Sequence, residues 1–186
     1  MKNIDLTNVQ EAEDFERLAP GGYICVIKTV KDVPDREYLR IEFDIAAGDH
    51  AGFYQRTYES SGYWLGSTIR SYKDSALRFF KSFITAIENS NPGYQWNNDE
   101  STLVGKKIGL VLSEEEYRSK KGEVKMKLVA NGCHSIQKIT SGEYKVPALK
   151  KLKDDDLYNK PAEIGNIGSS IQNDLAPSSN QECPFA

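Results

Sequence analysis

The feature that most constrains the fold is a change in the spacing of apolar residues along the chain. Between residues 22 and 59 apolar side chains recur at every second position, most cleanly in YLRIEFDIA at 38–46. That alternation is typical of strands with one buried face. Between residues 71 and 89 the spacing becomes three and four residues, as on the buried face of a helix. The chain is therefore predicted to place several strands before one long helix.

Two further strand-like segments follow the helix, and together these patterns predict a fold class. The predicted strands are 22–30, 38–46, 53–59, 105–117 and 122–132, and the predicted helix is 71–89. A five-stranded, partly open barrel with its helix between the third and fourth strands is the OB-fold. The order therefore favours a mainly β, OB-fold-like barrel with β-β-β-α-β-β order. A general α+β sheet with one helix packed on it is the alternative.

Composition divides the 186 residues into three parts. Residues 1–19 form an acidic N-terminal arm of net charge −3, residues 20–145 carry +2, and residues 146–186 carry −2. The apolar pattern of the core ends at Pro147, and residues 148–186 are rich in Gly, Ser, Asn and Pro. Such a segment buries too little apolar surface to offset its ordering entropy, so a flexible tail follows the core at 20–147. A mildly basic core between acidic extensions suits a domain that binds a polyanion.

Aromatic and basic residues interleave around the predicted third strand. One face of that strand would carry Tyr54, Arg56 and Tyr58. The segment that follows adds Tyr63, Trp64, Arg70, Tyr72 and Lys73. Aromatic rings that stack on bases, mixed with cations that neutralise phosphates, are typical of single-stranded nucleic-acid binding. Tyrosines are also ordinary sheet formers that pair across strands, which is the competing interpretation of each one alone.

A second basic set follows the last two strands. It comprises Lys106, Lys107, Arg118, Lys120, Lys121, Lys125 and Lys127. Glu114, Glu115 and Glu116 lie beside it and weaken its positive field, and exposed lysines in a hairpin loop are usually only solvated. Lys106, Lys107, Lys125 and Lys127 are nevertheless taken as candidate phosphate contacts.

Neither catalysis nor a bound cofactor is predicted. The phosphate-binding, dinucleotide-binding, serine-hydrolase and zinc-protease motifs are missing from the sequence, and no acidic pair suggests a general acid and base. Asp44, Asp49 and His50 fit a turn better than a metal site. Cys25, Cys133 and Cys183 have no metal-ligand spacing, so no metal is expected and a reducing, cytoplasmic setting fits best. The sequence contains no apolar run long enough to cross a membrane.

The segment VGKKIGLVLSEEEYRSKKGEVKMKLVANGCHSIQKITSGEYKVPALKKL resembles a family of small proteins encoded by bacteriophages of Gram-positive bacteria. The matching features are the GKK strand, the Glu-Tyr pair after it, the basic loop, the following strand and the proline-containing segment near VPALKKL. The resemblance covers roughly residues 15–152. It implies an OB-fold protein that binds single-stranded DNA during phage replication or recombination, in the cytoplasm of the host.

The C-terminal NQECPFA is similar to the tip of bacterial single-stranded-DNA-binding proteins, which docks on replication and repair enzymes. Pro184 and Phe185 match that tip, with Glu182 and Asp174 as the nearest acids. Ala186 displaces the terminal carboxylate by one residue, and the usual dense acidic run is missing. The resemblance implies that partner enzymes are recruited through Pro184 and Phe185.

The sequence thus predicts a protein that binds single-stranded DNA with little sequence preference, protects it and recruits replication or recombination proteins. A protein-interaction adaptor, which loads a recombinase or replisome without binding DNA, is the alternative. An enzyme such as a nuclease is the least favoured reading. Homo-oligomerisation stays open.

Overall fold

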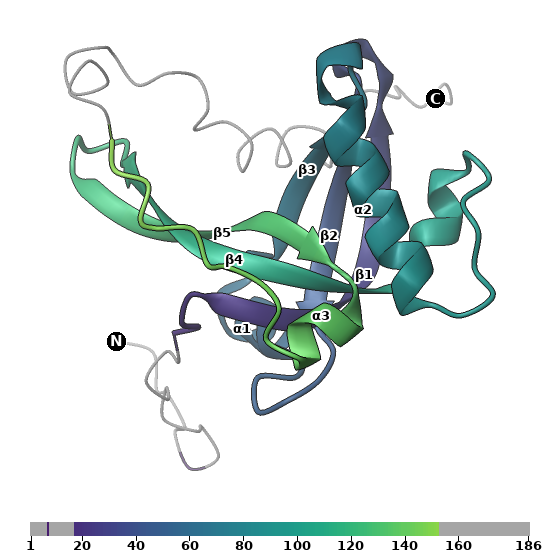
Figure 1. The fold of residues 1–186 in the computed structure, drawn as a ribbon. Coiled ribbons are helices and arrows are strands. Elements are labelled where there is room, and N and C mark those ends of the chain that lie inside the picture. The colour runs from purple at the N-terminus through teal and green to yellow at the C-terminus, as the bar shows by residue number, and fades with distance from the viewer. Residues whose placement is uncertain (1–6, 8–16, 153–186) are drawn as a thin grey trace, which may run out of the picture.

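A computed structural model describes residue 7 and residues 17–152 of the chain, and within them the fold is mainly β. Five strands form one antiparallel sheet (Figure 1). They are β1 (Gly21–Val33), β2 (Tyr38–Ile45), β3 (Ser67–Ser71), β4 (Lys107–Arg118) and β5 (Val124–His134). The helices are α1 (Phe53–Ser61), α2 (Leu77–Ser90) and α3 (Ile136–Thr140), with short 3-10 turns at Pro34–Arg36, Asp74–Ala76 and Glu100–Leu103.

The long strand β1 joins two halves of the sheet, whose order is β3-β2-β1-β4-β5. Its first part, Gly21–Val26, pairs with β4, and its later part, Cys25–Val33, pairs with β2. The register shifts between Ile27 and Thr29, and such an irregularity bends a strand and increases its twist. In Figure 1, β2 and β3 accordingly stand upright while β4 and β5 run across them.

The two outer strands, β3 and β5, approach each other through one side chain. Arg70 of β3 lies opposite the buried Leu39, so its side chain points to the core side of the sheet. Its Nη2 donates a hydrogen bond to the carbonyl oxygen of Ala130 on β5, at 3.2 Å. Within residues 17–152, however, β3 pairs only with β2 and β5 only with β4. The five-stranded antiparallel sheet is therefore confirmed, and a closed barrel is not established.

Helix α2 lies between β3 and β4 in the chain, as predicted, and packs against β3, β4 and β5. Its buried face carries Phe83, Ile84, Ala86 and Ile87. These side chains join one apolar core with inward residues of β1, β2 and β4. The predicted helix began too early: Ser71 ends β3, and α2 starts only at Leu77. Leu77 and Phe79, two apolar residues of the segment with helical spacing, are exposed.

The predicted third strand at 53–59 is wrong, because these residues form α1. The sequence FYQRTYE alternates in polarity but also repeats at helical spacing, and Tyr54 and Thr57 are its buried side chains. The Tyr54 ring packs edge-on against Phe43 of β2, with ring centroids 5.4 Å apart. Tertiary packing of this helical face therefore overrides the β preference of the tyrosines.

The start of α1 is fixed from the neighbouring strand. Asp44 of β2 is buried, and its Oδ1 accepts hydrogen bonds from the backbone N–H groups of Ile45, at 2.8 Å, and Tyr54, at 2.9 Å. A carboxylate here satisfies one of the N–H groups that the first helical turn leaves without a partner. Gly52 precedes the helix with φ of 74°, a left-handed conformation that glycine adopts without strain.

The actual third strand, STIRS at Ser67–Ser71, carries no regular apolar alternation in the sequence. It pairs antiparallel with β2, and the carbonyl of Gly66 just before it accepts a hydrogen bond from Phe43 N–H at 2.8 Å. A Cβ at Gly66 would collide with the Phe43 carbonyl oxygen and the Tyr54 ring. Only glycine therefore allows β3 to begin beneath α1.

Residues at both ends of the predicted core take part in the fold. Leu18, from the predicted acidic arm, is buried in the core. After α3 the chain returns along β4, where Lys150 forms a parallel bridge with Glu115 on the edge that β1 leaves unpaired. The predicted arm at 1–19 and tail at 148–186 otherwise lie mostly outside the described residues. Within the described residues, no helix has the length and apolar character that a membrane span requires.

Candidate nucleic-acid interface

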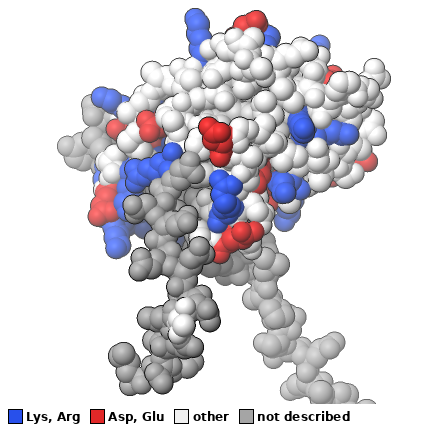
Figure 2. All heavy atoms as spheres, turned by 90° about the horizontal axis from the view of Figure 1, so that it is seen from below, with Lys and Arg blue, Asp and Glu red and all other residues white. Residues whose placement is uncertain are grey.

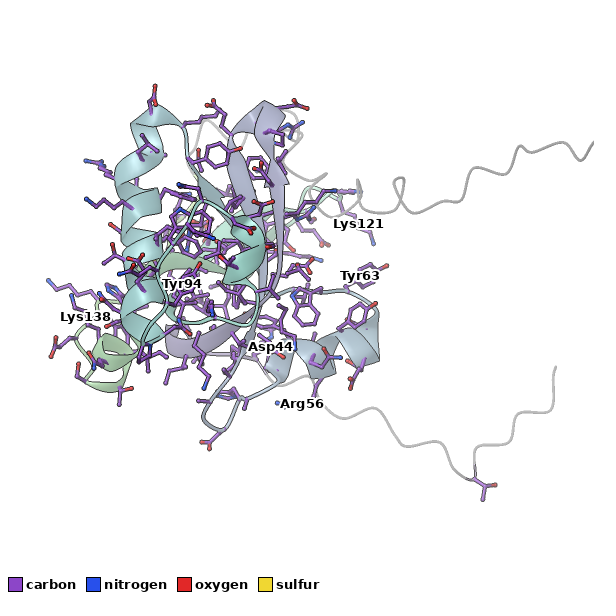
Figure 3. The ribbon with its side chains drawn as sticks, turned by 90° about the vertical axis from the view of Figure 1, so that its right-hand side faces the viewer. Asp44, Arg56, Tyr63, Tyr94, Lys121 and Lys138 are labelled. Atoms are coloured by element: carbon purple, nitrogen blue, oxygen red, sulfur yellow. The ribbon has the colours of Figure 1, made fainter. Side chains whose placement is uncertain are left out.

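The strongest candidate surface is an aromatic cluster at the junction of α1 and β3, formed by Tyr58, Tyr63, Trp64 and Leu65. Tyr63 is 64% exposed, Leu65 61% and Tyr58 46%, although all three are large apolar side chains. The Tyr58 and Trp64 rings lie 6.0 Å apart at 56°. Figure 3 shows Tyr63 pointing away from the body of the protein, on the side opposite α2.

Local hydrogen bonds hold this aromatic cluster in place. Gly62 ends α1 in the left-handed conformation, and its N–H donates to the Tyr58 carbonyl. The Tyr63 N–H donates to Ser61 Oγ at 3.2 Å, and Trp64 Nε1 donates to the Gly66 carbonyl at 3.0 Å. Because the indole nitrogen bonds within its own loop, the flat face of the ring is held in one orientation.

The three residues predicted to share one strand face are separated by the helix. Tyr54 points into the core, and burial raises the pKa of its hydroxyl above the ordinary range. Arg56 donates a hydrogen bond to the Ala51 carbonyl, across the turn that precedes α1. Only Tyr58 joins the aromatic cluster. Figure 3 shows Arg56 and Tyr63 on the same side of the molecule, at different ends of α1.

Arg70 occupies a structural position between β3 and β5. Its guanidinium lies 5.7 Å from the centroid of the Phe83 ring, and burial lowers its pKa. Its Nη1 and Nη2 donate to the carbonyls of Ile69 and Ala130, while its buried Nε has no hydrogen-bond partner. Arg70 therefore links the edge strands β3 and β5 and is not part of the aromatic cluster.

Tyr72 is also placed inward, against Phe80, with which it makes an edge-on contact at 6.0 Å between ring centroids. Its hydroxyl donates to Asp32 Oδ1 at 2.8 Å. This hydrogen bond raises the pKa of Tyr72 to about 12. The neighbouring Lys73 is exposed. Tyr72 therefore packs on α2, and only Lys73 of this pair faces solvent.

The Tyr72 hydroxyl should contribute a pH-dependent part of the stability. Its pKa is raised in the folded state, so its contribution is complete below about pH 10 and is lost as the pH rises towards about 12. Urea unfolding of the wild type and Tyr72→Phe at several pH values should show a stability difference that shrinks over this interval. A difference independent of pH would contradict the role of the hydrogen bond to Asp32.

The sequence-based prediction missed a row of side chains on the solvent face of β1, β2 and β3. Lys31 pairs with Arg40, and Arg40 pairs with Ile69, so the three lie side by side across the strands. Lys31 is exposed and Ile69 is 38% exposed. The alternation in 38–46 already placed Arg40 on the face opposite the core residues. Its position beside Ile69 could not be predicted, because the third strand was predicted at 53–59 and not at Ser67–Ser71.

The second basic set divides into two groups. Lys106 lies 4.6 Å from the Tyr94 ring centroid, and Lys107 begins β4. Lys125 and Lys127 lie far along the β4–β5 hairpin. Lys125 forms an ion pair with Glu123 at 3.2 Å, and Lys127 lies 5.9 Å from the Tyr117 ring. Figure 2 shows acidic and basic side chains interspersed on the face seen from below, so that face carries no continuous positive field.

Two cysteines lie within the described residues, and neither is part of a metal site. Cys25 is buried in the core, and burial raises the pKa of its thiol above the ordinary range. Cys133 is partly buried, and its pKa is also raised by burial. Residues 17–152 contain no group of three His, Cys, Asp or Glu side chains that could hold a metal ion. Asp44 instead accepts the backbone bonds at the start of α1.

The predicted docking residues Pro184 and Phe185 lie outside the described residues.

Comparison of the chain with protein-family models and with curated proteins gives no match. The features that agree with the resemblance noted in the sequence are thus the five-stranded antiparallel sheet and the helix between β3 and β4.

Proposed function

We propose that the protein binds single-stranded DNA with little sequence preference and protects it during replication or recombination, as a phage-type protein of this kind would do. An OB-fold barrel is the architecture we infer for it. The strand order β3-β2-β1-β4-β5 supports this inference, because it leaves β3 and β5 as the edges that such a barrel would join. Arg70 already links these edges through the Ala130 carbonyl.

The observation that carries the proposal is the aromatic cluster of Tyr58, Tyr63, Trp64 and Leu65. Large apolar side chains at such exposure are costly unless they serve a contact. Stacking on an aromatic ring is tolerant of sequence, because every base has a flat π face. Trp64 is half-buried against the core and bonded to Gly66, so the part of its ring that reaches solvent would contact a base without a further entropic cost.

Binding of a single strand also requires cations that neutralise its phosphates, and the neighbouring sheet face supplies them. Lys31 and Arg40 lie in one row with Ile69, on the solvent side of the strands that lead to the aromatic cluster. In an OB-fold, the face of strands two and three binds the ligand. Stacking at the cluster and phosphate neutralisation along this row would together bind a strand without reading its bases.

Fluorescence anisotropy with a labelled oligo-dT tests the proposal. We expect micromolar or tighter binding that weakens steeply as salt is raised, because each neutralised phosphate releases counterions. A duplex of the same length is the matched competitor and should bind more weakly, since its bases are already stacked. Equal or tighter binding to the duplex would contradict the proposal.

Recruitment of replication or recombination proteins through Pro184 and Phe185 is the second part of the proposal. It rests on the sequence of the tip alone. Deletion of the last residues should leave oligo-dT affinity intact and abolish capture of a partner enzyme. Loss of DNA affinity on the same deletion would instead place these residues in the DNA-binding surface.

One observation favours the alternative, a protein-binding adaptor. On the β4–β5 hairpin, Val124 and Met126 are 51% and 52% exposed, and they lie on the same face of β5. The outer edge of β5 is also unpaired along Val124–Val129 within the described residues, and such an edge can add a strand from another protein. If the protein is such an adaptor, the substitutions Tyr58→Ala and Tyr63→Ala would leave DNA binding unchanged.

A further inference from the structure

A groove on the other side of the molecule lies between α2, the end of β5 and the start of α3. Its lining includes Arg78, Lys81, Thr85 and Asn89 from α2, Cys133 from β5 and Lys138 from α3. Two serines, Ala86 and His134 complete the lining, which contains no carboxylate and no Phe, Tyr or Trp side chain. The groove therefore offers hydrogen-bond donors and positive charge, and the imidazole of His134 is the one ring in its lining.

Within residues 17–152, the cations of this groove form no ion pair with a carboxylate. Among the described residues, the ion pairs of the structure involve Lys125 and Lys150, both elsewhere. Arg78 instead lies over the ring of the exposed Phe79, with its guanidinium 4.5 Å from the ring centroid. Glu143 lines the neighbouring hollow, which it shares with Lys138. Three positive charges thus remain available for an anion.

The side chains that α2 contributes form a continuous stripe. Arg78, Lys81, Thr85 and Asn89 follow one another at steps of three and four residues, which places them on one face of a helix. The stripe covers twelve residues, and the eleven steps between its ends correspond to about 16 Å along the helix axis. At 3.4 Å per nucleotide, it would accompany roughly five nucleotides of a stacked strand. An extended polyanion fits this stripe better than a single small ion.

The groove and the aromatic cluster face away from each other. In Figure 3, Lys138 projects on the side of α2, whereas Tyr63 and Arg56 project on the opposite side. A ligand that contacts both surfaces must therefore pass around the domain. A domain of about 140 residues has a radius of gyration of about 14 Å, so a path halfway around it is at least about 44 Å. Eight nucleotides at the rise of a duplex strand span only about 27 Å.

We propose that this α2–α3 groove binds the sugar–phosphate backbone of single-stranded DNA as a second, base-independent contact. The inference rests on the proposed function, because the same strand would stack on the aromatic cluster and continue into the groove. Short strands would occupy the aromatic cluster alone, while longer strands would wrap around the domain and gain affinity from the groove. Site size and salt dependence would then both increase with strand length.

The test compares two charge-matched double variants, Lys81→Gln with Lys138→Gln in the groove and Lys145→Gln with Lys151→Gln outside it. All four lysines are exposed, so the fold should tolerate each change. Binding to dT8 and dT35 is measured by anisotropy across a range of salt concentrations. The slope of log affinity against log salt is about −0.7 per phosphate contact in single strands. We expect the groove variant to lose about 1.4 of this slope with dT35 and none with dT8.

The control variant should retain the wild-type slope with both strands. If the groove and control variants behave alike with dT35, the inference is overturned, while wild-type binding to dT8 would leave the proposed function standing. Absence of wild-type binding to either strand would overturn both. If the groove variant loses the slope but the aromatic cluster proves dispensable, the groove remains and the proposed stacking surface fails.

Discussion

The Tyr58→Ala, Tyr63→Ala double variant is expected to bind dT8 at least about 30-fold more weakly than the wild type. Stacking of a base on an aromatic side chain contributes about 1–3 kcal/mol, so two lost platforms cost about 2 kcal/mol or more. Each factor of ten in affinity corresponds to about 1.4 kcal/mol. Both side chains are exposed, so their removal should leave the core intact. Anisotropy measures the affinity, and urea unfolding verifies the fold.

Phe79→Ala is the matched control for this loss of affinity. Phe79 is 59% exposed, comparable to the two tyrosines, but it lies on α2, on the far side of the molecule. The control should bind dT8 as the wild type does. Equal losses in the control and the double variant would show that exposed aromatic residues contribute nonspecifically. An unchanged affinity in the double variant would favour the adaptor function.

Asp44→Ala should lower the free energy of unfolding by about 2–4 kcal/mol. Its buried carboxylate accepts the N–H groups of Ile45 and Tyr54, and hydrogen bonds to charged groups contribute about 1.5–3 kcal/mol each. Removing the carboxylate leaves both N–H groups without this acceptor, at the junction of β2 and α1. Because α1 positions Tyr58, the variant should also bind dT8 more weakly. Urea unfolding measures the first effect and anisotropy the second.

Two comparisons isolate the role of Asp44. Asp49→Ala removes the same charge from the connection that follows β2, but Asp49 is exposed, so the stability should change little. Asp44→Asn retains an oxygen that can accept the same bonds, so it should be less destabilising than Asp44→Ala. If Asp44→Ala is as stable as Asp49→Ala, the carboxylate does not hold the start of α1.

The long elements could be predicted because each has one unambiguous period. β2 alternates from Leu39 to Ile45, and both structure and sequence place Arg40 and Glu42 opposite the core residues, whereas Asp44 is buried at the start of α1. The segment 53–59 has both the two-residue alternation of a strand and the three-residue spacing of a helix. Only the packing of Tyr54 against Phe43 selects the helix. β3 is five residues long and partly exposed, so it leaves no apolar pattern in the sequence. Its position depends on the hydrogen bonds with β2.

Part of the candidate site could be predicted because some of its residues are neighbours in the sequence. Tyr58, Tyr63 and Trp64 come together because they are close in the sequence and flank a helix end. The predicted strand at 53–59 placed Tyr54 on the surface, and residue type placed Arg70 there, whereas the structure buries Tyr54 and half-buries Arg70. The α2–α3 groove combines residues about fifty positions apart in the chain. No local pattern could indicate that Lys81 and Lys138 line one groove.

The return of the chain along β4 determines how mechanical load would enter the protein. Lys150 exchanges two backbone hydrogen bonds with Glu114 and Glu116, and the Leu152 N–H donates to the Glu116 carboxylate at 3.0 Å. A pull on the residues after Leu152 therefore acts first on these three bonds, at the edge of the hairpin. They would give way before the core strands bear any tension.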